Sequence, residues 1–124
     1  MSDNITKGKH GEKLAEIFLT EQSCQMIARR FRSRYGEIDL IATRSVDELH
    51  FVEVKYRTSD EYGEPFEAVD FRKRARLKRL AEFFLLQSGS LYLRHKVHFS
   101  VVSIVAEPDL PLSIEWLQID PFSF

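Results

Sequence analysis

Two opposite charges interrupt an apolar stretch near the middle of the chain, where residues 51–57 read FVEVKYR. Successive side chains of a β-strand point to opposite faces, so Glu53 and Lys55 would share one face while the valines occupy the other. Asp39 alternates in the same way in the preceding segment, and a hairpin pairing would bring it beside Glu53. Two carboxylates buried together need a cation, which could be Lys55, an arginine or a metal ion. Oxygen ligands of this kind select Mg²⁺ or Mn²⁺.

The same residues also fit a purely structural role. A Glu-x-Lys pair in a strand can form a cross-strand salt bridge on a solvent-facing sheet surface. The catalytic interpretation depends on the combination of Asp39, Glu53 and Lys55 with polar groups that reach the same place from two helices. Glu12 would come from the first helix and Lys73 from the second.

A basic run lies in the second half of the chain. Residues 72–79, RKRARLKR, contain six basic side chains and no acidic one, although the whole chain has a net charge of only −1. Lys73 is four residues after Val69 and four before Leu77, on the helical stripe that should face the sheet. The arginines of the run should point outward, either as a phosphate-binding surface or as an ordinary solvated helix face. They are Arg72, Arg74, Arg76 and Arg79.

Hydrophobic periodicity predicts two helices and five strands that would position these residues. The first helix is predicted over residues 7–22, with Thr6 as its N-cap. Its apolar stripe would consist of Leu14, Ala15, Phe18 and Leu19. The second helix is predicted over residues 66–87. The strands are predicted over residues 25–31, 37–44, 48–58, 96–107 and 113–119.

The resulting order, α-β-β-β-α-β-β, describes a single α/β domain with a mixed β-sheet flanked by helices. The short turn SVDE favours an antiparallel pairing of the second and third strands, and the helix after the third strand permits a parallel pairing with the fourth. The fourth strand is apolar enough to be buried on both faces, and the fifth is predicted at the edge. Alternation in the second strand assigns Ile38, Leu40 and Ala42 to one face and Glu37, Asp39 and Ile41 to the other.

Composition excludes several classes of protein. The chain has 124 residues and no apolar run near the roughly 20 residues that span a membrane. Its N-terminus lacks the apolar core of a secretory signal, so a cytoplasmic location is expected. The single Cys24 cannot form an internal disulfide, and the histidines lack the paired spacing of a structural zinc site, so zinc is not expected. The histidines are His10, His50, His95 and His98.

The order of elements, with Asp39 followed by Glu53-x-Lys55, resembles the PD-(D/E)XK nuclease superfamily. More closely, four segments resemble the YraN-like family of small bacterial proteins that are predicted endonucleases. They are GEIDLIA at residues 36–42, FVEVKYR at 51–57, G-x-x-G-E at 8–12 and A-V-x-x-R-K at 68–73. The resemblance covers roughly residues 8–105. It implies a restriction-endonuclease-like core of order αβββαβ, here followed by one more strand.

By this resemblance, Asp39 and Glu53 would bind a divalent metal ion, Mg²⁺ or Mn²⁺, together with the main-chain carbonyl of Val54. Lys55 would orient the attacking water or help to deprotonate it, and Glu12 would approach from the first helix. The candidate catalytic residues are therefore Glu12, Asp39, Glu53, Lys55 and Lys73.

Two positions differ from the family's usual pattern, and the role of a third position is open. Residues 98–102 read His-Phe-Ser-Val-Val where relatives commonly have Arg-Phe-Asp-Val-Val, so Ser100 replaces a supporting carboxylate. Arg30 occupies a position where Asn is usual. Glu37 would be either an auxiliary metal ligand or a surface partner for an arginine.

These observations lead to three hypotheses of function. The first is metal-dependent hydrolysis of phosphodiester bonds in DNA, with branched or structured DNA as a candidate substrate and a homodimer as a way to cut two strands. The second is a DNA-binding module that keeps a nuclease scaffold without cutting, and the third is a protein that docks through its C-terminal PFSF. Under the first two, phosphates would be bound by Arg72, Arg74, Arg76, Arg79, Arg57 and Arg32, with Arg29, Arg30 and Arg34 nearby.

Overall fold

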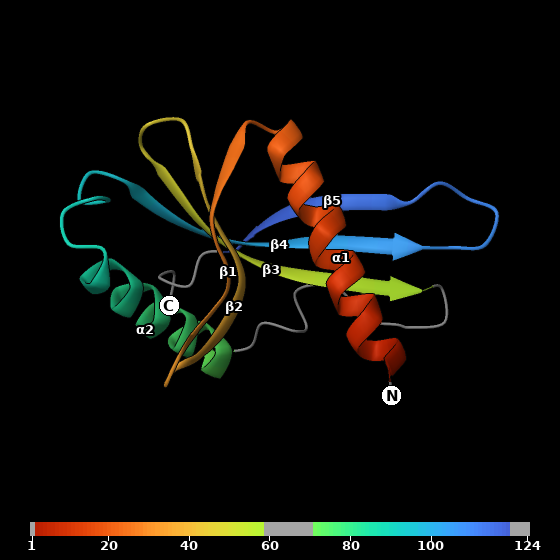
Figure 1. Ribbon diagram of the computed structural model, residues 1–124, viewed down its shortest axis with the longest axis horizontal. Helices are drawn as coiled ribbons and strands as arrows, with labels where there is room; N and C mark the ends of the chain where they lie inside the picture. Colours follow the sequence, from red (N-terminus) through yellow and green to blue (C-terminus); the bar gives the residue numbers. More distant parts are fainter. Residues whose placement is uncertain (1, 59–70, 120–124) are drawn as a thin grey trace.

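The computed structural model describes residues 2–58 and 71–119, which form two helices and one five-stranded sheet (Figure 1). The helices are α1 (Ser2–Glu21) and α2 (Phe71–Gln87). The strands are β1 (Cys24–Ser33), β2 (Gly36–Arg44), β3 (Glu48–Thr58), β4 (Lys96–Ala106) and β5 (Ser113–Ile119). The predicted order of elements is confirmed. The predicted start of the second helix and the C-terminal PFSF lie outside the described residues.

The five strands lie in the order β1-β2-β3-β4-β5, and the sheet is mixed. The β1–β2, β2–β3 and β4–β5 pairs are antiparallel, whereas β3 and β4 are parallel, as expected for strands joined through a crossover helix. The single α/β domain with a mixed sheet flanked by helices is therefore confirmed. β5 lies at an edge, and β4 is buried on both faces along its middle.

Each helix covers a different face of the sheet (Figure 1). Ala15 and Leu19 of α1 pack on a cluster that includes Val52 of β3, and Leu77 and Leu80 of α2 pack on a cluster that includes Phe51. Neighbouring residues of β3 thus belong to opposite cores, as strand alternation requires. Burial of these apolar surfaces is the main force that holds both helices on the sheet.

The pairing of β1 with β2 shifts in register between Met26 and Ala28, and the backbone is irregular again at Arg30. Phe31 pairs with Ile38 and Arg29 with Leu40, which sets Arg30 opposite Asp39. Arg30 has a φ of 51°, in the left-handed region that few residues other than glycine, Asn and Asp adopt. The position where relatives commonly have Asn is therefore one whose backbone suits Asn.

The irregularity overturns one prediction about β2. Ile38 packs in the cluster beneath α2, whereas Leu40 and Ala42 pack in the cluster beneath α1. The assignment of all three to one face is wrong because the strand pair turns between Ile38 and Leu40. In Figure 1, β1 and β2 curve together and diverge from the far half of β3. The β2–β3 pairing accordingly ends at Leu40 and Val52.

The predicted start of the first helix is also wrong. α1 begins at Ser2, so Thr6 lies within the helix and is not its N-cap. The preceding residues, Ser2 to Ile5, contain no proline that would stop a helix, so the cap-type residue Thr6 does not mark the boundary. Among residues 2–58 and 71–119, no helix is long and apolar enough to cross a membrane.

Candidate active site

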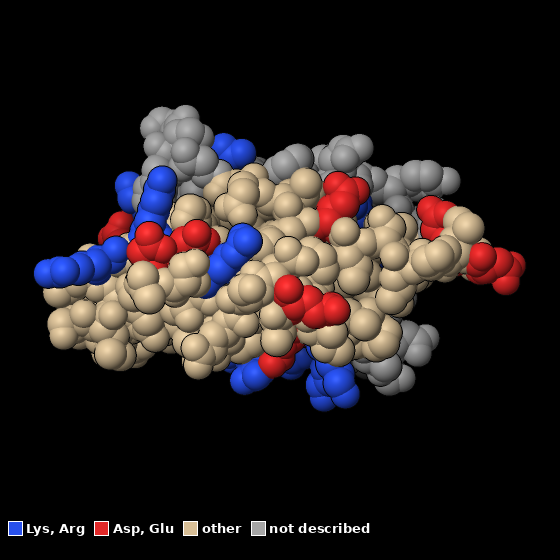
Figure 2. Space-filling model, turned by 90° about the horizontal axis from the view of Figure 1, so that it is seen from above, with Lys and Arg blue, Asp and Glu red and all other residues tan. Residues whose placement is uncertain are grey.

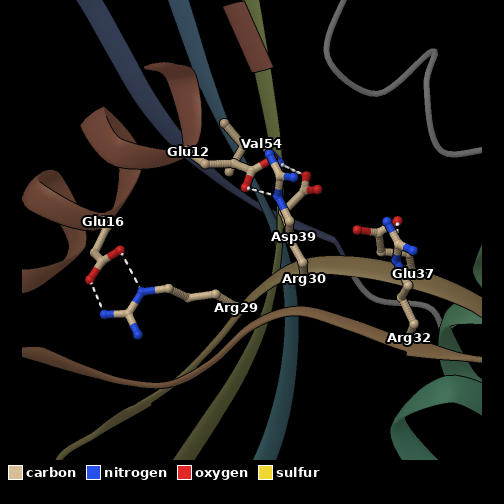
Figure 3. Close-up of polar contacts among 8 residues, drawn as sticks. All are labelled: Glu12, Glu16, Arg29, Arg30, Arg32, Glu37, Asp39 and Val54. Atoms are coloured by element: carbon tan, nitrogen blue, oxygen red, sulfur yellow. Dashed lines mark hydrogen bonds and ion pairs between the residues drawn. The ribbon is translucent and has the colours of Figure 1, made fainter. Parts of the chain in front are cut away.

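Asp39 lies where the pairing between β2 and β3 ends. Its carboxylate oxygen Oδ2 accepts a hydrogen bond from the main-chain N–H of Val54, with 2.7 Å between the two atoms (Figure 3). The Val54 N–H thus binds the Asp39 side chain, at a point where β3 is no longer paired with the main chain of β2. This hydrogen bond fixes the carboxylate against β3, next to Glu53. Beyond this point β3 continues to Thr58 with β4 as its paired neighbour.

The surroundings of Asp39 disfavour its charged form. Its pKa is raised to about 6, chiefly by burial and also by the charges of Glu53, Glu12 and Glu37, while the hydrogen bond from the Val54 N–H opposes this rise. Three other carboxylates therefore lie close enough to Asp39 to act on its charge. We call Asp39, Glu53 and Glu12 the acidic group; they come from β2, β3 and α1, so three separate elements contribute to it.

Glu12 reaches the site because α1 approaches β3 closely at the preceding residue. Gly11 is buried, and a Cβ atom at this position would lie 2.8 Å from the Cβ of Tyr56. Glu12 accepts a hydrogen bond from Nε of Arg30 at 2.8 Å. The Arg30 guanidinium also lies near the Asp39 carboxylate, as Figure 3 shows, and the acidic groups raise its pKa. An arginine is thus one of the cations of this group.

Glu53 lies on the face of β3 that α2 covers, whereas Glu12 comes from α1 on the other face of the sheet. Its side chain is 12% exposed, and Nζ of Lys73 lies 2.7 Å from its Oε2. Lys73 therefore faces the sheet, as its place on the helical stripe predicts. Lys55 is half-buried and shares the Glu53 face of β3 by strand alternation.

Glu37 is a surface partner for an arginine. Its carboxylate lies 3.4 Å from Nε of Arg32, and both side chains are more than one-third exposed. Arg29 similarly forms an ion pair with Glu16 of α1 (Figure 3). Exposed pairs of this kind contribute little to stability. Each of these two arginines is already paired with a carboxylate.

The arginines of α2 do not all point outward. Arg72, Arg76 and Arg79 are exposed, as predicted. Arg74 is half-buried, and its Nε atom is buried without a hydrogen-bond partner among the described residues. The prediction that it points outward is wrong, because it follows Lys73 at the margin of the stripe that packs on the sheet. Arg57 of β3 is also half-buried.

Two hollows flank the acidic group. One, of about 180 Å³, is lined on the α2 side by Tyr35, Gly36, Glu37, Lys73, Arg76, Leu77 and Leu80. The other, of about 300 Å³, lies on the α1 side and is lined by Lys9, Glu12, Lys13, Glu16, Arg29, Arg30 and Leu40. The hollow on the α2 side has one carboxylate, Glu37, beside its basic side chains, whereas the hollow on the α1 side has Glu12 and Glu16. On the α1 side, a phosphate group could therefore approach Glu12 from a surface that also provides cations.

The acidic group fits a divalent metal ion by its chemistry. Carboxylates of Glu12, Asp39 and Glu53 are hard oxygen ligands of the kind that Mg²⁺ and Mn²⁺ prefer. Asp39 has a raised pKa, caused by burial and by the charges of the neighbouring carboxylates. This is expected of a site in which a metal ion would relieve the repulsion among the carboxylates.

A second cluster was not predicted from the sequence. Glu48, His50 and His98 each offer a ligand atom, and these atoms all lie within 4.8 Å of one another, so the three residues could hold a metal ion. The histidines are 48 positions apart and meet because β3 and β4 pair in parallel with His50 opposite His98. The histidines lack the paired spacing of a zinc site along the sequence, but the β3–β4 pairing brings these two together in the sheet. An alignment of the two predicted strands side by side would have indicated it.

Comparisons with known proteins identify relatives along most of the chain. Residues 11–104 match the uncharacterised protein family UPF0102. A UPF0102 protein of Rhodococcus jostii is 48% identical over 105 residues, which cover 85% of this chain and 86% of that protein. A UPF0102 protein of Natranaerobius thermophilus is 38% identical over 117 residues, which cover 94% of this chain and 97% of that protein. The matched region includes all three carboxylates of the acidic group, and the chain belongs to family UPF0102, the YraN-like family that its motifs resemble.

Proposed function

We propose that this chain is a metal-dependent endonuclease that hydrolyses phosphodiester bonds in DNA. The observation that carries the proposal is the Asp39 carboxylate, bound to the Val54 N–H at the end of the β2–β3 pairing and within electrostatic reach of Glu53 and Glu12. The αβββαβ order of the first six elements agrees with a restriction-endonuclease-like fold. We include this fold in the proposal.

Each residue of the site has a role that its position supports. Asp39 and Glu53 would hold Mg²⁺ or Mn²⁺ with the Val54 carbonyl, and Glu12 would add a carboxylate from α1. The bound ion would polarise the scissile phosphate and lower the pKa of a bound water. Lys55, on the Glu53 face of β3, would orient the attacking water and stabilise negative charge that develops on the phosphate.

The basic side chains on the walls of the two hollows would place the DNA backbone. Lys73 and Arg76 line the hollow on the α2 side, and Arg30 lines the one on the α1 side. Arg30 already binds a carboxylate oxygen of Glu12, so a phosphate oxygen could take its place as the acceptor. Arg30 would then release Glu12 toward the metal site when DNA binds.

The test is cleavage of linear, flapped and four-way-junction DNA with Mg²⁺, with Mn²⁺ and with chelator. We expect cleavage that requires the metal ion and is lost in Asp39→Asn and in Lys55→Met. Lys55→Met should keep most of the metal affinity measured by calorimetry, because Lys55 is not a ligand, whereas Asp39→Asn should lose it. The matched control is Glu115→Gln, which removes an exposed carboxylate from β5. Cleavage that survives in Asp39→Asn would contradict the proposal.

A second candidate is a DNA-binding module that does not cut. It is favoured by the two cations that already accompany the acidic group, since Arg30 binds Glu12 and Lys73 contacts Glu53. Ser100, in place of a usual carboxylate, adds no negative charge to this group. Its hydroxyl oxygen accepts a hydrogen bond from Nε1 of Trp116 at 2.8 Å. This candidate predicts DNA binding without metal binding by wild-type protein, which the same calorimetry detects.

A further inference from the structure

We propose that Glu48, His50 and His98 form a second metal site, for a borderline transition-metal ion such as Zn²⁺. This site is independent of the proposed nuclease function. It lies at the beginning of β3, whereas Asp39 and Glu53 lie where β2 separates from β3. The ligand set of two imidazoles and one carboxylate suits Zn²⁺, which binds nitrogen and oxygen ligands and does not require the all-oxygen set of Mg²⁺.

The strands hold the three side chains in position. His50 and His98 are directly opposite in the parallel β3–β4 pair, and Glu48 precedes His50 by two residues, so all three share one face. The two rings are stacked with their centroids 4.7 Å apart and their planes inclined by 16°. An oxygen of Glu48 lies 2.8 Å from Nε2 of His50. The pairing of β3 with β4 therefore brings the three ligand side chains together.

The spacing of the ligand atoms is close to what a metal ion needs. Zn²⁺ binds nitrogen and oxygen at about 2.1 Å, and a tetrahedral arrangement then separates ligand atoms by about 3.4 Å. The three candidate atoms already lie within 4.8 Å of one another. Coordination would require changes in side-chain rotamers that bring these atoms closer together. Three protein ligands leave one position for water, and the Glu48 side chain, 33% exposed, provides the route from solvent.

Two ring nitrogens in this cluster lack a partner that buried polar atoms usually have. Nδ1 of His50 and Nε2 of His98 are buried, and neither has a hydrogen bond among the described residues. A buried nitrogen without a partner costs free energy, which coordination of a metal ion would recover for each nitrogen that binds it. Stacking of two histidines in a core gives no reason for these nitrogens to remain unpaired.

Arg44 is the neighbour that opposes a cation. It pairs with Glu48 across β2 and β3, and its guanidinium lies over the Trp116 ring at 5.5 Å from the centroid. Its charge acts on both Glu48 and His50. If the cluster binds a metal ion, Arg44→Gln should tighten binding because a repulsive charge is removed. If the cluster is only structural, the same change has no effect on metal binding.

The experiment is a calorimetric titration of metal-free, tag-free full chain with Zn²⁺, alongside Co²⁺, whose visible absorption reports tetrahedral coordination. We expect one equivalent of Zn²⁺ to bind and to raise the melting temperature. Glu48→Gln and His98→Gln should each weaken binding by on the order of tenfold or more. His95→Gln, which removes a histidine outside the cluster, should bind Zn²⁺ as wild type does.

Asp39→Asn separates this site from the acidic group and should keep the equivalent of Zn²⁺ that binds to Glu48, His50 and His98. Since Glu48 is partly exposed, Glu48→Gln should fold even if His98→Gln does not, and circular dichroism checks both. The proposal is overturned if the wild type binds no Zn²⁺. It is equally overturned if Glu48→Gln binds Zn²⁺ as tightly as wild type, or if Asp39→Asn abolishes the binding.

Discussion

The Asp39 carboxylate accepts one hydrogen bond and is repelled by three other carboxylates. The hydrogen bond from Val54 fixes its direction, while burial and the charges of Glu53, Glu12 and Glu37 favour its neutral form. Arg30 and Lys73 each accompany one of the other carboxylates. Asp39 is therefore the member of the group whose charge is least compensated by the ion pairs described, and the one that a metal ion would change most.

Asp39→Asn should stabilise the metal-free protein at neutral pH. Because the pKa of Asp39 is about 6 in the folded protein and ordinarily 3.8, the folded state binds more protons than the unfolded state between these values. Stability therefore falls as pH rises from about 4 to about 6, by roughly 3 kcal/mol in total. Asn removes the charge and keeps an oxygen for the Val54 N–H. The melting temperature of the variant should exceed that of wild type at pH 7.5 and converge with it near pH 4.

Glu115→Gln is the control for this measurement, since it removes an exposed carboxylate of β5 and should change the melting temperature little. A lower melting temperature of Asp39→Asn at pH 7.5 would show that the ionised carboxylate stabilises the fold, as in a structural salt bridge.

At the scale of elements, the close approach of α1 to β3 decides where Glu12 lies. The contact is made at Gly11, whose missing side chain lets the helix pack against Tyr56. The next residue of the helix is Glu12, so the depth of packing at Gly11 sets how far the carboxylate extends over the acidic group. Gly8, one turn earlier, has no atom within 4 Å of where a Cβ would stand and has no comparable role.

Gly11→Ala and Gly8→Ala form a matched pair that tests this packing. Gly11→Ala places a methyl group 2.8 Å from Tyr56 and should destabilise the protein by about 1–3 kcal/mol, because α1 must move away from β3. Gly8→Ala meets no contact and should stabilise the protein by up to about 1 kcal/mol through helix propensity. Urea denaturation measures both. Equal effects of the two substitutions would exclude close packing at Gly11.

Periodicity predicted the elements well, because each apolar stripe lies on a helix or strand that packs as a unit. Lys73 on the sheet-facing stripe and the pairing of β2 with β3 follow directly from that pattern. Ile38 was assigned to the wrong face because the positive φ of Arg30, which lies on the neighbouring strand, leaves no mark in the alternation of β2. The Arg30–Glu12 pair and the His50–His98 stack were not predicted, because each joins segments whose relative placement only the folded sheet provides.

At the scale of the whole molecule, the basic side chains are concentrated in particular segments and do not give the protein a net positive charge. On the face shown in Figure 2, Lys and Arg lie among Asp and Glu, with large uncharged areas between them. The net charge of −1 gives no general attraction to nucleic acid. DNA binding would therefore depend on particular arginines, and Arg72, Arg76 and Arg79 of α2 are the exposed ones in the basic run.

Replacement of Arg72 and Arg76 by Gln should weaken DNA binding and reduce its dependence on salt. Each lost phosphate contact lowers the slope of log affinity against log salt by about 1, so the double variant should lose about 2. Melting temperature should change little, since both side chains are exposed. Arg94→Gln with Lys96→Gln removes the same charge elsewhere and should leave the slope unchanged. An unchanged slope in the α2 variant would make the basic run an ordinary solvated helix face.

The placement of α1 and α2 on opposite faces has a consequence for when the proposed site can exist. Glu12 arrives from one face and Lys73 from the other, and Asp39 and Glu53 lie between them in the sheet. No hairpin or helix alone contains the whole set. A chain emerging from the ribosome would hold Asp39 and Glu53 before α2 and β4 have been made, and would still lack the complete site. An enzyme assembled in this way could cut DNA only after both helices had docked, so its own folding would delay the onset of a potentially harmful activity.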